Sequence, residues 1–164
     1  MTSKGPAGPF FVAGPGVVPA PDVVVDTNVA LDLLVFGDPR ASALRDALAL
    51  GRCRWIACRA MRDELADVLA RSGLRRWTID RDAVMAAFDA TVADVGPPVR
   101  HGALSCSDPD DQVFLDLALG RRAGMLISRD KALLRLVKPA ARHGLVIVQP
   151  EGWRAAQGGL SEPG

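Results

Sequence analysis

Four acidic residues lie in otherwise apolar sequence, where a carboxylate is costly unless it has a partner: Asp26, Glu64, Asp111 and Asp130. A buried carboxylate without a partner is unfavourable, and four carboxylates that converge repel one another unless a cation lies among them. Mg²⁺ and Mn²⁺ prefer such hard oxygen ligands. The pattern therefore predicts a site for one of these metals, with weaker binding in acid because the ligands become protonated.

Each of these acids also has an alternative structural role. Asp26 and Asp130 each precede a predicted helix, so either could serve as its N-cap. Glu64 could instead form an ion pair with Arg62 or Arg129. The prediction of a metal site therefore rests on all four acids occurring together in one alternating fold.

The segment around Asp111 holds three further acids. Asp108 precedes Pro109, and proline favours the first position of a helix. Capping is therefore the expected role of Asp108, and contact with a metal is its second role. Asp110 is expected to complement the start of this helix, and Asp116 is expected to face water.

Short apolar segments alternate with segments of helical periodicity along the chain. This alternation is typical of an α/β fold with a mostly parallel sheet. Strands are predicted at residues 23–25, 54–57, 125–127 and 145–148. Helices are predicted at residues 29–34, 41–50, 60–70, 80–94, 109–121 and 131–136.

These predicted elements carry the four acids toward one edge of the sheet. Ligands of open parallel sheets bind at the carboxyl ends of the strands. Asp26 directly follows the first strand, and Asp130 lies just beyond the strand at residues 125–127. Glu64 and Asp111 fall on the apolar stripes of their helices, which face inward. We therefore expect the four carboxylates to converge.

The composition predicts one domain at residues 21–154, with a flexible Gly- and Pro-rich leader at 1–20 and a flexible tail at 155–164. Lys and Arg number 20 against 19 Asp and Glu, so the net charge of +1 excludes a global field that attracts polyanions. Three cysteines without paired spacing disfavour a disulfide framework or a structural zinc site. Because no continuous apolar segment resembles a signal peptide or a membrane span, a cytoplasmic location without membrane attachment is expected.

Four motifs carry a resemblance to a known family. They are VVVDTNVAL at residues 23–31, RDELADVL at 62–69, DPDDQVFLDLA at 108–118 and LISRDKALL at 126–134. Together they resemble the PIN domain, and within it the bacterial branch of toxin components (VapC-like). The likeness covers nearly all of residues 22–149, and the motifs occur in the family's order.

The resemblance implies a three-layer α/β/α sandwich and a metal-dependent ribonuclease with Mg²⁺ or Mn²⁺ as cofactor. By position, Asp26, Glu64, Asp111 and Asp130 resemble the family's catalytic and metal-binding acids. The choice of Asp111 over Asp110 follows its spacing to the apolar positions of its helix. Supporting roles are implied for Thr27, Asn28, Asp108 and Ser128.

The toxin branch further implies an RNA substrate, a protein antitoxin and a homodimer. Arg71, Arg75 and Arg76, next to Trp77, form the expected segment of RNA contact, because arginine and aromatic side chains hold phosphates and bases. His101 and His143 lie apart from the acidic motifs, so a histidine-based mechanism is disfavoured.

Two alternatives remain open at this point. One is a noncatalytic module of the same fold that binds nucleic acid or protein; the presence of all four acids argues against it. The other is an aspartyl-phosphate phosphatase, whose nucleophilic Asp is followed two residues later by a second Asp. Here Asn28 occupies that second position after Asp26, so we rank this alternative last.

Overall fold

The computed structural model describes residues 20–71 and 78–153. Its centre is a five-stranded sheet in the order β4-β3-β2-β5-β6, in which every pair of neighbouring strands is parallel. The strands are β2 (Asp22–Val25), β3 (Arg54–Ala57), β4 (Ala93–Asp94), β5 (Met125–Ile127) and β6 (Val146–Val148). The parallel sheet confirms the prediction of an α/β fold.

Seven α-helices are present in the described residues: α1 (Thr27–Leu31), α2 (Ser42–Ala49), α3 (Arg59–Ala70), α4 (Arg81–Thr91), α5 (Gln112–Gly120), α6 (Lys131–Leu134) and α7 (Val137–Ala141). Short irregular helices extend or join them. A π-helical turn at Asp32–Phe36 continues α1, and 3-10 helices form at Pro39–Ala41, Pro109–Asp111 and Pro150–Gly152.

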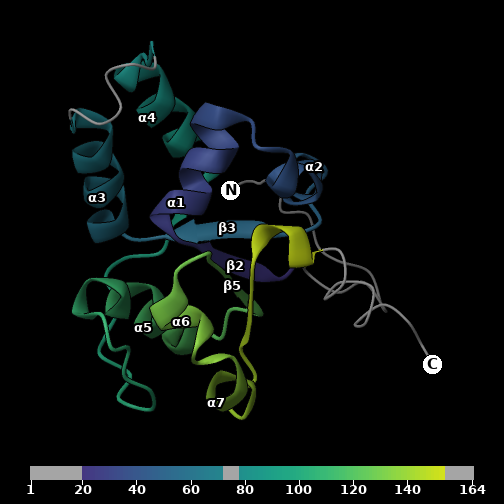
Figure 1. Ribbon diagram of the computed structural model, residues 1–164, viewed down its shortest axis with the longest axis vertical. Helices are drawn as coiled ribbons and strands as arrows, with labels where there is room; N and C mark the ends of the chain where they lie inside the picture. Colours follow the sequence, from purple (N-terminus) through teal and green to yellow (C-terminus); the bar gives the residue numbers. More distant parts are fainter. Residues whose placement is uncertain (1–19, 72–77, 154–164) are drawn as a thin grey trace, which may run out of the picture.

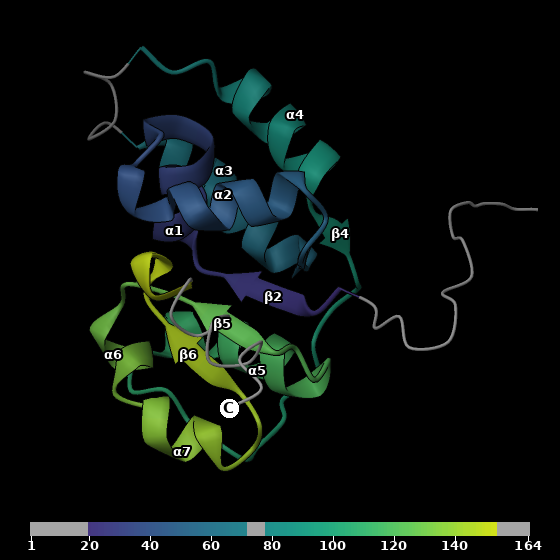
Figure 2. The same cartoon turned by 90° about the vertical axis from the view of Figure 1, so that its right-hand side faces the viewer.

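The helices form two layers, with α1 to α4 on one side of the sheet and α5 to α7 on the other (Figures 1 and 2). The strand order explains this division. From β2 the chain moves outward through β3 to β4, then crosses to β5 and moves the opposite way to β6. Because crossovers between parallel strands are right-handed, reversing the direction of travel moves the helices to the opposite face. The result is the three-layer α/β/α arrangement expected of a PIN-like fold.

The core lies on both faces of the central strands. β2, β3 and β5 are short runs of apolar residues, and Val23, Val24, Ile56, Leu126 and Ile127 are all inaccessible to solvent. A strand covered by helices on both faces reads as a continuous apolar run, which is why these three strands could be predicted.

One aromatic contact joins the sheet to the helical layer above it. The Trp55 ring of β3 meets the Phe88 ring of α4 edge to face, with centroids 5.5 Å apart. Both side chains are buried. Trp153 is buried as well, so core packing is the role of two of the three tryptophans, and Trp77 lies outside the described residues.

The predicted helix at residues 80–94 is wrong at its carboxyl end. α4 ends at Thr91, and Ala93–Asp94 form the edge strand β4 instead. Ala93 and Asp94 pair with Ile56 and Ala57 of β3. A strand of two residues is too short to show the alternation of period two by which strands are recognised, so only the tertiary pairing reveals it.

The predicted helix at residues 131–136 is also incomplete. The structure has α6 at Lys131–Leu134 and a second helix, α7, at Val137–Ala141 that was not predicted. Pro139 occupies the third position of α7, within the first turn. Proline is tolerated there because the first N–H groups of a helix have no partner within it.

Within the described ranges, no helix is both long and apolar enough to cross a membrane. The predicted domain at 21–154 encloses both described ranges apart from residue 20. The predicted leader and tail fall outside them, except for residue 20.

Candidate metal centre

The carboxyl ends of β2 and β5 meet where the chain reverses its direction across the sheet. These two strands are neighbours, with Val25 in register with Ile127. The helix after β2 lies on one face of the sheet, and the helices after β5 lie on the other. A crevice forms at such a reversal, and ligands of open α/β sheets bind there. The residues that follow β2 and β5 are therefore the first candidates for chemistry.

Asp26 follows β2 and is held by hydrogen bonds on both carboxylate oxygens. Oδ1 accepts a hydrogen bond from the Val29 backbone N–H at 2.9 Å, and Oδ2 accepts one from the Ser128 hydroxyl. Asp26 is 4 % exposed, and this burial raises the pKa of its carboxyl. The capping role is therefore confirmed, and Ser128 joins the ends of β2 and β5.

Three carboxylates lie close together beside this junction. Asp108, Asp111 and Asp130 each place one oxygen within 4.8 Å of the other two. Asp108 is the N-cap of the 3-10 turn before α5 and Asp111 is its last residue, while Asp130 is the N-cap of α6. The third and fourth motifs therefore converge, although Asp130 lies 19 positions after Asp111 along the chain.

Asp111 provides the test of whether this group fits a cation. Its Oδ2 is buried and has no hydrogen-bond donor. Burial, followed by the negative charge of Asp130, raises the pKa of Asp111 to about 7. A buried carboxylate oxygen without a donor is unfavourable, and a divalent cation would satisfy it. The acidic cluster is thus compatible with metal binding.

Asp108 and Asp130 also cap helices. The Asp110 N–H donates to Asp108 Oδ1 at 3.0 Å, and the Ala132 N–H donates to Asp130 Oδ1 at 2.8 Å. The predicted capping role of Asp108 is confirmed. Because a cap occupies one oxygen and a carboxylate has two, these caps orient the side chains and remain compatible with a ligand role.

Glu64 reaches the site from α3. Its Oε2 accepts a hydrogen bond from the Thr27 hydroxyl at 2.9 Å, which links the first and second motifs. The alternative ion pairs of Glu64 are wrong: Arg62 binds Asp89 at 2.7 Å, and Arg129 binds Asp32 at 2.9 Å. Glu64 and Asp26 lie outside the group of three close carboxylates, but both face the same cavity.

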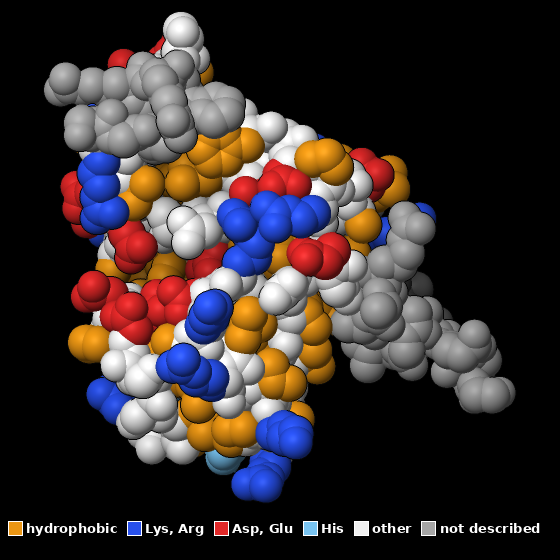
Figure 3. Space-filling model, in the orientation of Figure 1, with side chains coloured by type: hydrophobic (Ala, Val, Ile, Leu, Met, Phe, Trp, Pro, Cys, Tyr) orange, Lys and Arg blue, Asp and Glu red, His pale blue; other side chains and the backbone are white. Residues whose placement is uncertain are grey.

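All four predicted acids line one open cavity of about 710 Å³. Asp and Glu side chains gather around it at the left of the molecule, between α3 above and α5 below (Figure 3). Asn28 also lines it, and its described wall holds eight acids and a single basic residue, Arg71. The eight acids are Asp26, Asp63, Glu64, Asp67, Asp108, Asp110, Asp111 and Asp130. Arg75 and Arg76 lie outside the described residues.

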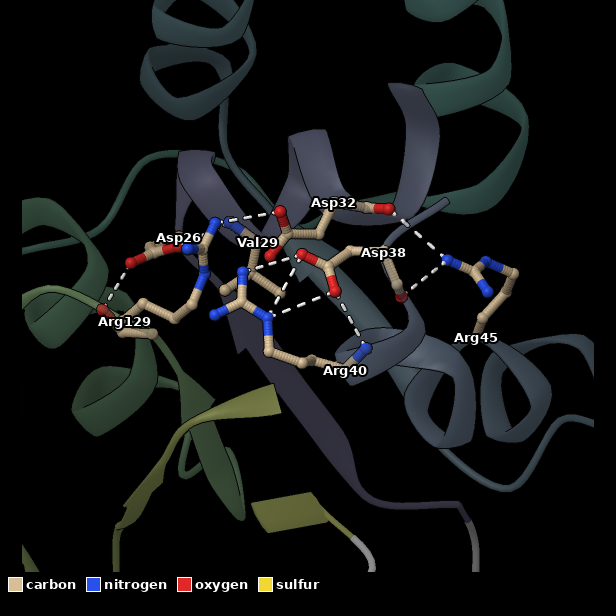
Figure 4. A network of polar contacts seen from close by, with 8 residues as sticks. Asp26, Val29, Asp32, Asp38, Arg40, Arg45 and Arg129 are labelled. Atoms are coloured by element: carbon tan, nitrogen blue, oxygen red, sulfur yellow. Dashed lines mark hydrogen bonds and ion pairs between the residues drawn. The ribbon is translucent and has the colours of Figure 1, made fainter. Parts of the chain in front are cut away.

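An ion pair between Arg129 and the buried Asp32, beside the site, was not predicted. Asp32, in the π-helical turn after α1, is 2 % exposed and accepts a hydrogen bond from Arg129 at 2.9 Å. Figure 4 shows Arg129 between Asp26 and Asp32. Its positive charge lowers the pKa of both carboxyls, although burial raises each by more. Asp32 is the single charged residue in the apolar segment 29–36, and this context could have indicated that its carboxylate is buried and paired.

The prediction that Asp116 faces water is wrong. Asp116 is 6 % exposed and accepts hydrogen bonds from the Gln112 side chain at 3.0 Å and from the His101 backbone N–H at 3.3 Å. The loop that follows β4 covers this face of α5, which periodicity alone did not show. His101 and His143 are exposed.

A family model described as PIN domain matches residues 22–132, which is more than half of the 164 residues. The matched range contains Asp26, Glu64, Asp108, Asp111 and Asp130. No curated protein matches the chain.

Proposed function

Because the chain belongs to the PIN domain family, whose members are generally nucleases, we propose that it is a metal-dependent endoribonuclease. The observation that carries the proposal is the group formed by Asp108, Asp111 and Asp130, whose ligand oxygens lie within 4.8 Å of one another. The Asp111 Oδ2 oxygen is buried without a hydrogen-bond donor, and a bound cation would satisfy it. Cleavage of RNA phosphodiester bonds is the reaction we assign.

We assign Asp26, Glu64, Asp111 and Asp130 as the catalytic acids that would hold Mg²⁺ or Mn²⁺. The contacts of Asp108 with Asp111 and Asp130 support adding it to this set. Thr27 and Ser128 would act as supports, because their hydroxyls bind Glu64 and Asp26. Asn28 faces the same cavity and would support the site from its rim.

When bound, the metal lowers the pKa of a coordinated water and offsets charge that builds on the phosphate. The protein's own contribution is orientation. Backbone N–H groups at the starts of three helices fix Asp26, Asp108 and Asp130, so these carboxylates are positioned before a substrate arrives. Neither histidine nor cysteine lines the described cavity wall, which supports direct hydrolysis by water rather than a covalent intermediate on those side chains.

The charge of the cavity supports a metal requirement for substrate binding as well. Eight carboxylates and one arginine in the described wall would repel a phosphodiester chain. Bound cations would reverse that repulsion locally. Arg71 stands at the wall and would contact RNA phosphates, together with Arg75 and Arg76, which lie outside the described residues.

We further propose that the protein acts in the cytoplasm as the toxin component of a toxin–antitoxin system and as a homodimer. The motif resemblance to the VapC-like branch supports this role. Expression of the wild-type chain in bacterial cells would then arrest growth and cleave RNA, whereas Asp111→Asn would do neither. Growth without arrest, with the wild-type protein folded and present, would count against the toxin role and leave the nuclease proposal intact.

The decisive experiment is cleavage of labelled single-stranded RNA with Mn²⁺ or Mg²⁺, compared with EDTA. We expect cleavage only with metal, and a loss of about 100-fold or more in Asp111→Asn, since even outer-shell changes cost metal sites 10- to 100-fold. The matched control is Asp46→Asn, an exposed acid of α2 outside the cavity, which should retain activity.

Two results would contradict the nuclease proposal. One is cleavage that persists in EDTA or in Asp111→Asn. The other is RNA binding without cleavage across varied RNA sequences, which would indicate the noncatalytic module instead.

A further inference from the structure

We infer that Gln112 and Asp116 are positioning residues that set the affinity of the site for its metal by holding the loop before Asp108. The inference rests on the proposed metal-dependent function. Neither side chain is among the residues that line the cavity. They act from α5, on the side of the helix that the loop covers, and we call this pair the α5 clamp.

The loop at residues 97–107 contains no helix or strand, so its backbone needs partners elsewhere. Gln112 supplies two of them. Its Oε1 accepts a hydrogen bond from the Cys106 N–H at 2.7 Å, and its Nε2 donates to the Leu104 carbonyl at 3.0 Å. One amide thus holds two backbone groups two residues apart, which fixes both the position and the direction of the chain.

Asp116 supports this amide from one helical turn below. Its Oδ1 accepts hydrogen bonds from Gln112 Nε2 at 3.0 Å and from the His101 N–H at 3.3 Å. Residues four apart lie on the same face of a helix, so the pair forms one continuous surface against the loop. Asp116 is 6 % exposed, and the Arg100 guanidinium lies 3.9 Å from its other oxygen.

The clamp is connected to the metal group at both ends. Gln112 directly follows Asp111, and the held residue Cys106 lies two residues before Asp108. Hydrogen bonds from Gln112 therefore close the segment 104–112 on itself. Asp108 and Asp111 stand within this closed segment, and their carboxylates meet Asp130 from the next motif. Releasing the loop would loosen the capped turn that carries Asp108 and so change the position of its carboxylate relative to Asp130.

The test uses Gln112→Ala, which removes the three hydrogen bonds of the amide, and Mn²⁺ alone as the probe. We expect Mn²⁺ binding, followed by the signal of the free ion in electron paramagnetic resonance, to weaken by about 10- to 100-fold. Hydrogen exchange of the Cys106 amide should become faster in the same variant. This second readout needs neither metal nor RNA.

Asp116 provides the conservative comparison. Asp116→Asn keeps an oxygen that accepts from Gln112 and His101, so Mn²⁺ affinity should stay close to that of the wild type. Asp116→Ala loses that acceptor and should weaken binding. Leu119→Ala, a buried change in α5, should lower stability while leaving Mn²⁺ affinity unchanged well below its unfolding temperature. If Gln112→Ala fails to fold, Gln112→Glu replaces it, because it keeps the acceptor for Cys106 and loses the donor to Leu104 and Asp116.

The outcomes separate the inference from the proposed function. If the wild type binds Mn²⁺ and a folded Gln112→Ala binds it equally tightly, the clamp has no positioning role, although the metal site stands. Weakening in Leu119→Ala as large as in Gln112→Ala would also overturn the inference, since general destabilisation would explain both. If the wild type binds no Mn²⁺, the proposed function fails first, and the inference fails with it.

Discussion

Asp111 has a carboxylate that the folded chain leaves poorly satisfied. Its Oδ2 is buried without a donor, and its pKa is raised to about 7, first by burial and then by the charge of Asp130. Perturbed carboxyls of this kind gather at functional sites, although structural networks also produce them. Here the raised pKa coincides with two further carboxylates whose oxygens lie within 4.8 Å, an arrangement compatible with a bound cation.

The raised pKa of Asp111 predicts how the stability of the metal-free protein depends on pH. Its ordinary pKa of 3.8 applies to the unfolded chain, and about 7 applies to the folded chain. Between these pH values the folded protein binds more protons than the unfolded chain. Protonation of Asp111 therefore favours the folded state; this contribution to stability is fully present below pH 3.8 and is lost as the pH rises through 7. We expect a higher free energy of unfolding at pH 5 than at pH 8, measured by urea denaturation in EDTA.

Asp111→Asn should flatten this dependence and raise the stability at pH 8 by about 1 kcal/mol, a figure discounted for solvent screening. Asp26 and Asp32 also have raised pKa values, so a slope of the same sign should remain. Asp38 has its pKa lowered to about 2 by Arg40, and its effect falls below this pH range. A metal-free protein that is more stable at pH 8 than at pH 5 would contradict the assignment.

At the scale of elements, the start of α1 combines two functions in Asp26. The side chain caps the helix through Val29 and joins β5 through Ser128. The same carboxylate lines the cavity. An alanine substitution alone cannot separate the capping role of such a residue from its role in the site, because it would reduce stability and activity together.

Three substitutions at Asp26 separate these functions. Asp26→Ser and Asp26→Asn keep a good N-cap without the negative charge, so both should fold with little loss of stability and lose RNA cleavage. Asp26→Ala should lose cleavage and about 1 kcal/mol of stability. The measurements are thermal unfolding and metal-dependent cleavage of single-stranded RNA.

Asp80→Ala provides the matched control for the cap. Asp80 caps α4 through the Ala83 N–H at 3.1 Å and does not line the cavity. This variant should lose about 1 kcal/mol of stability and keep cleavage. Cleavage retained in Asp26→Asn would remove Asp26 from the catalytic acids.

At the scale of the whole molecule, the reversal of strand order decides where the site lies. β2 and β5 are adjacent in the sheet, yet 99 residues lie between Val25, the last residue of β2, and Met125, the first residue of β5. In the described part of that segment, five α-helices and two strands intervene. The first and fourth motifs meet because the chain returns to the centre of the sheet. The two helical layers then supply Glu64 from one side and Asp111 from the other.

Metal should stabilise the whole fold, because a site drawn from both layers is assembled only when the protein is folded. A ligand that binds only the folded state at roughly 100 times its dissociation constant adds about 2.7 kcal/mol. We therefore expect Mn²⁺ or Mg²⁺ to raise the unfolding temperature, measured by differential scanning calorimetry, and EDTA to reverse the rise.

Asp111→Asn should lose most of this shift, whereas Asp46→Asn should show all of it. No shift with either metal in intact wild-type protein would count against an assembled site. A shift of equal size in Asp111→Asn would place the ion elsewhere on the molecule.

The sequence by itself determined the class of fold and singled out the candidate acids. Continuous apolar runs in β2, β3 and β5 are the local pattern of strands buried on both faces, and the inward stripe of α3 marks Glu64. Short elements were missed where local pattern is weak. β4 has two residues, and α7 begins with a segment that contains Pro139.

Only the tertiary structure decided which acids lie within ligand distance of one another and which are held by other side chains. Asp108 joins Asp111 and Asp130, Asp26 is bound by Ser128, and Glu64 is bound by Thr27. It also decided that Asp32 pairs with Arg129 and that Asp116 lies beneath a loop. The physical reason is range: capping and periodicity act within a few residues, whereas burial and the repulsion between carboxylates depend on groups brought together from distant parts of the chain.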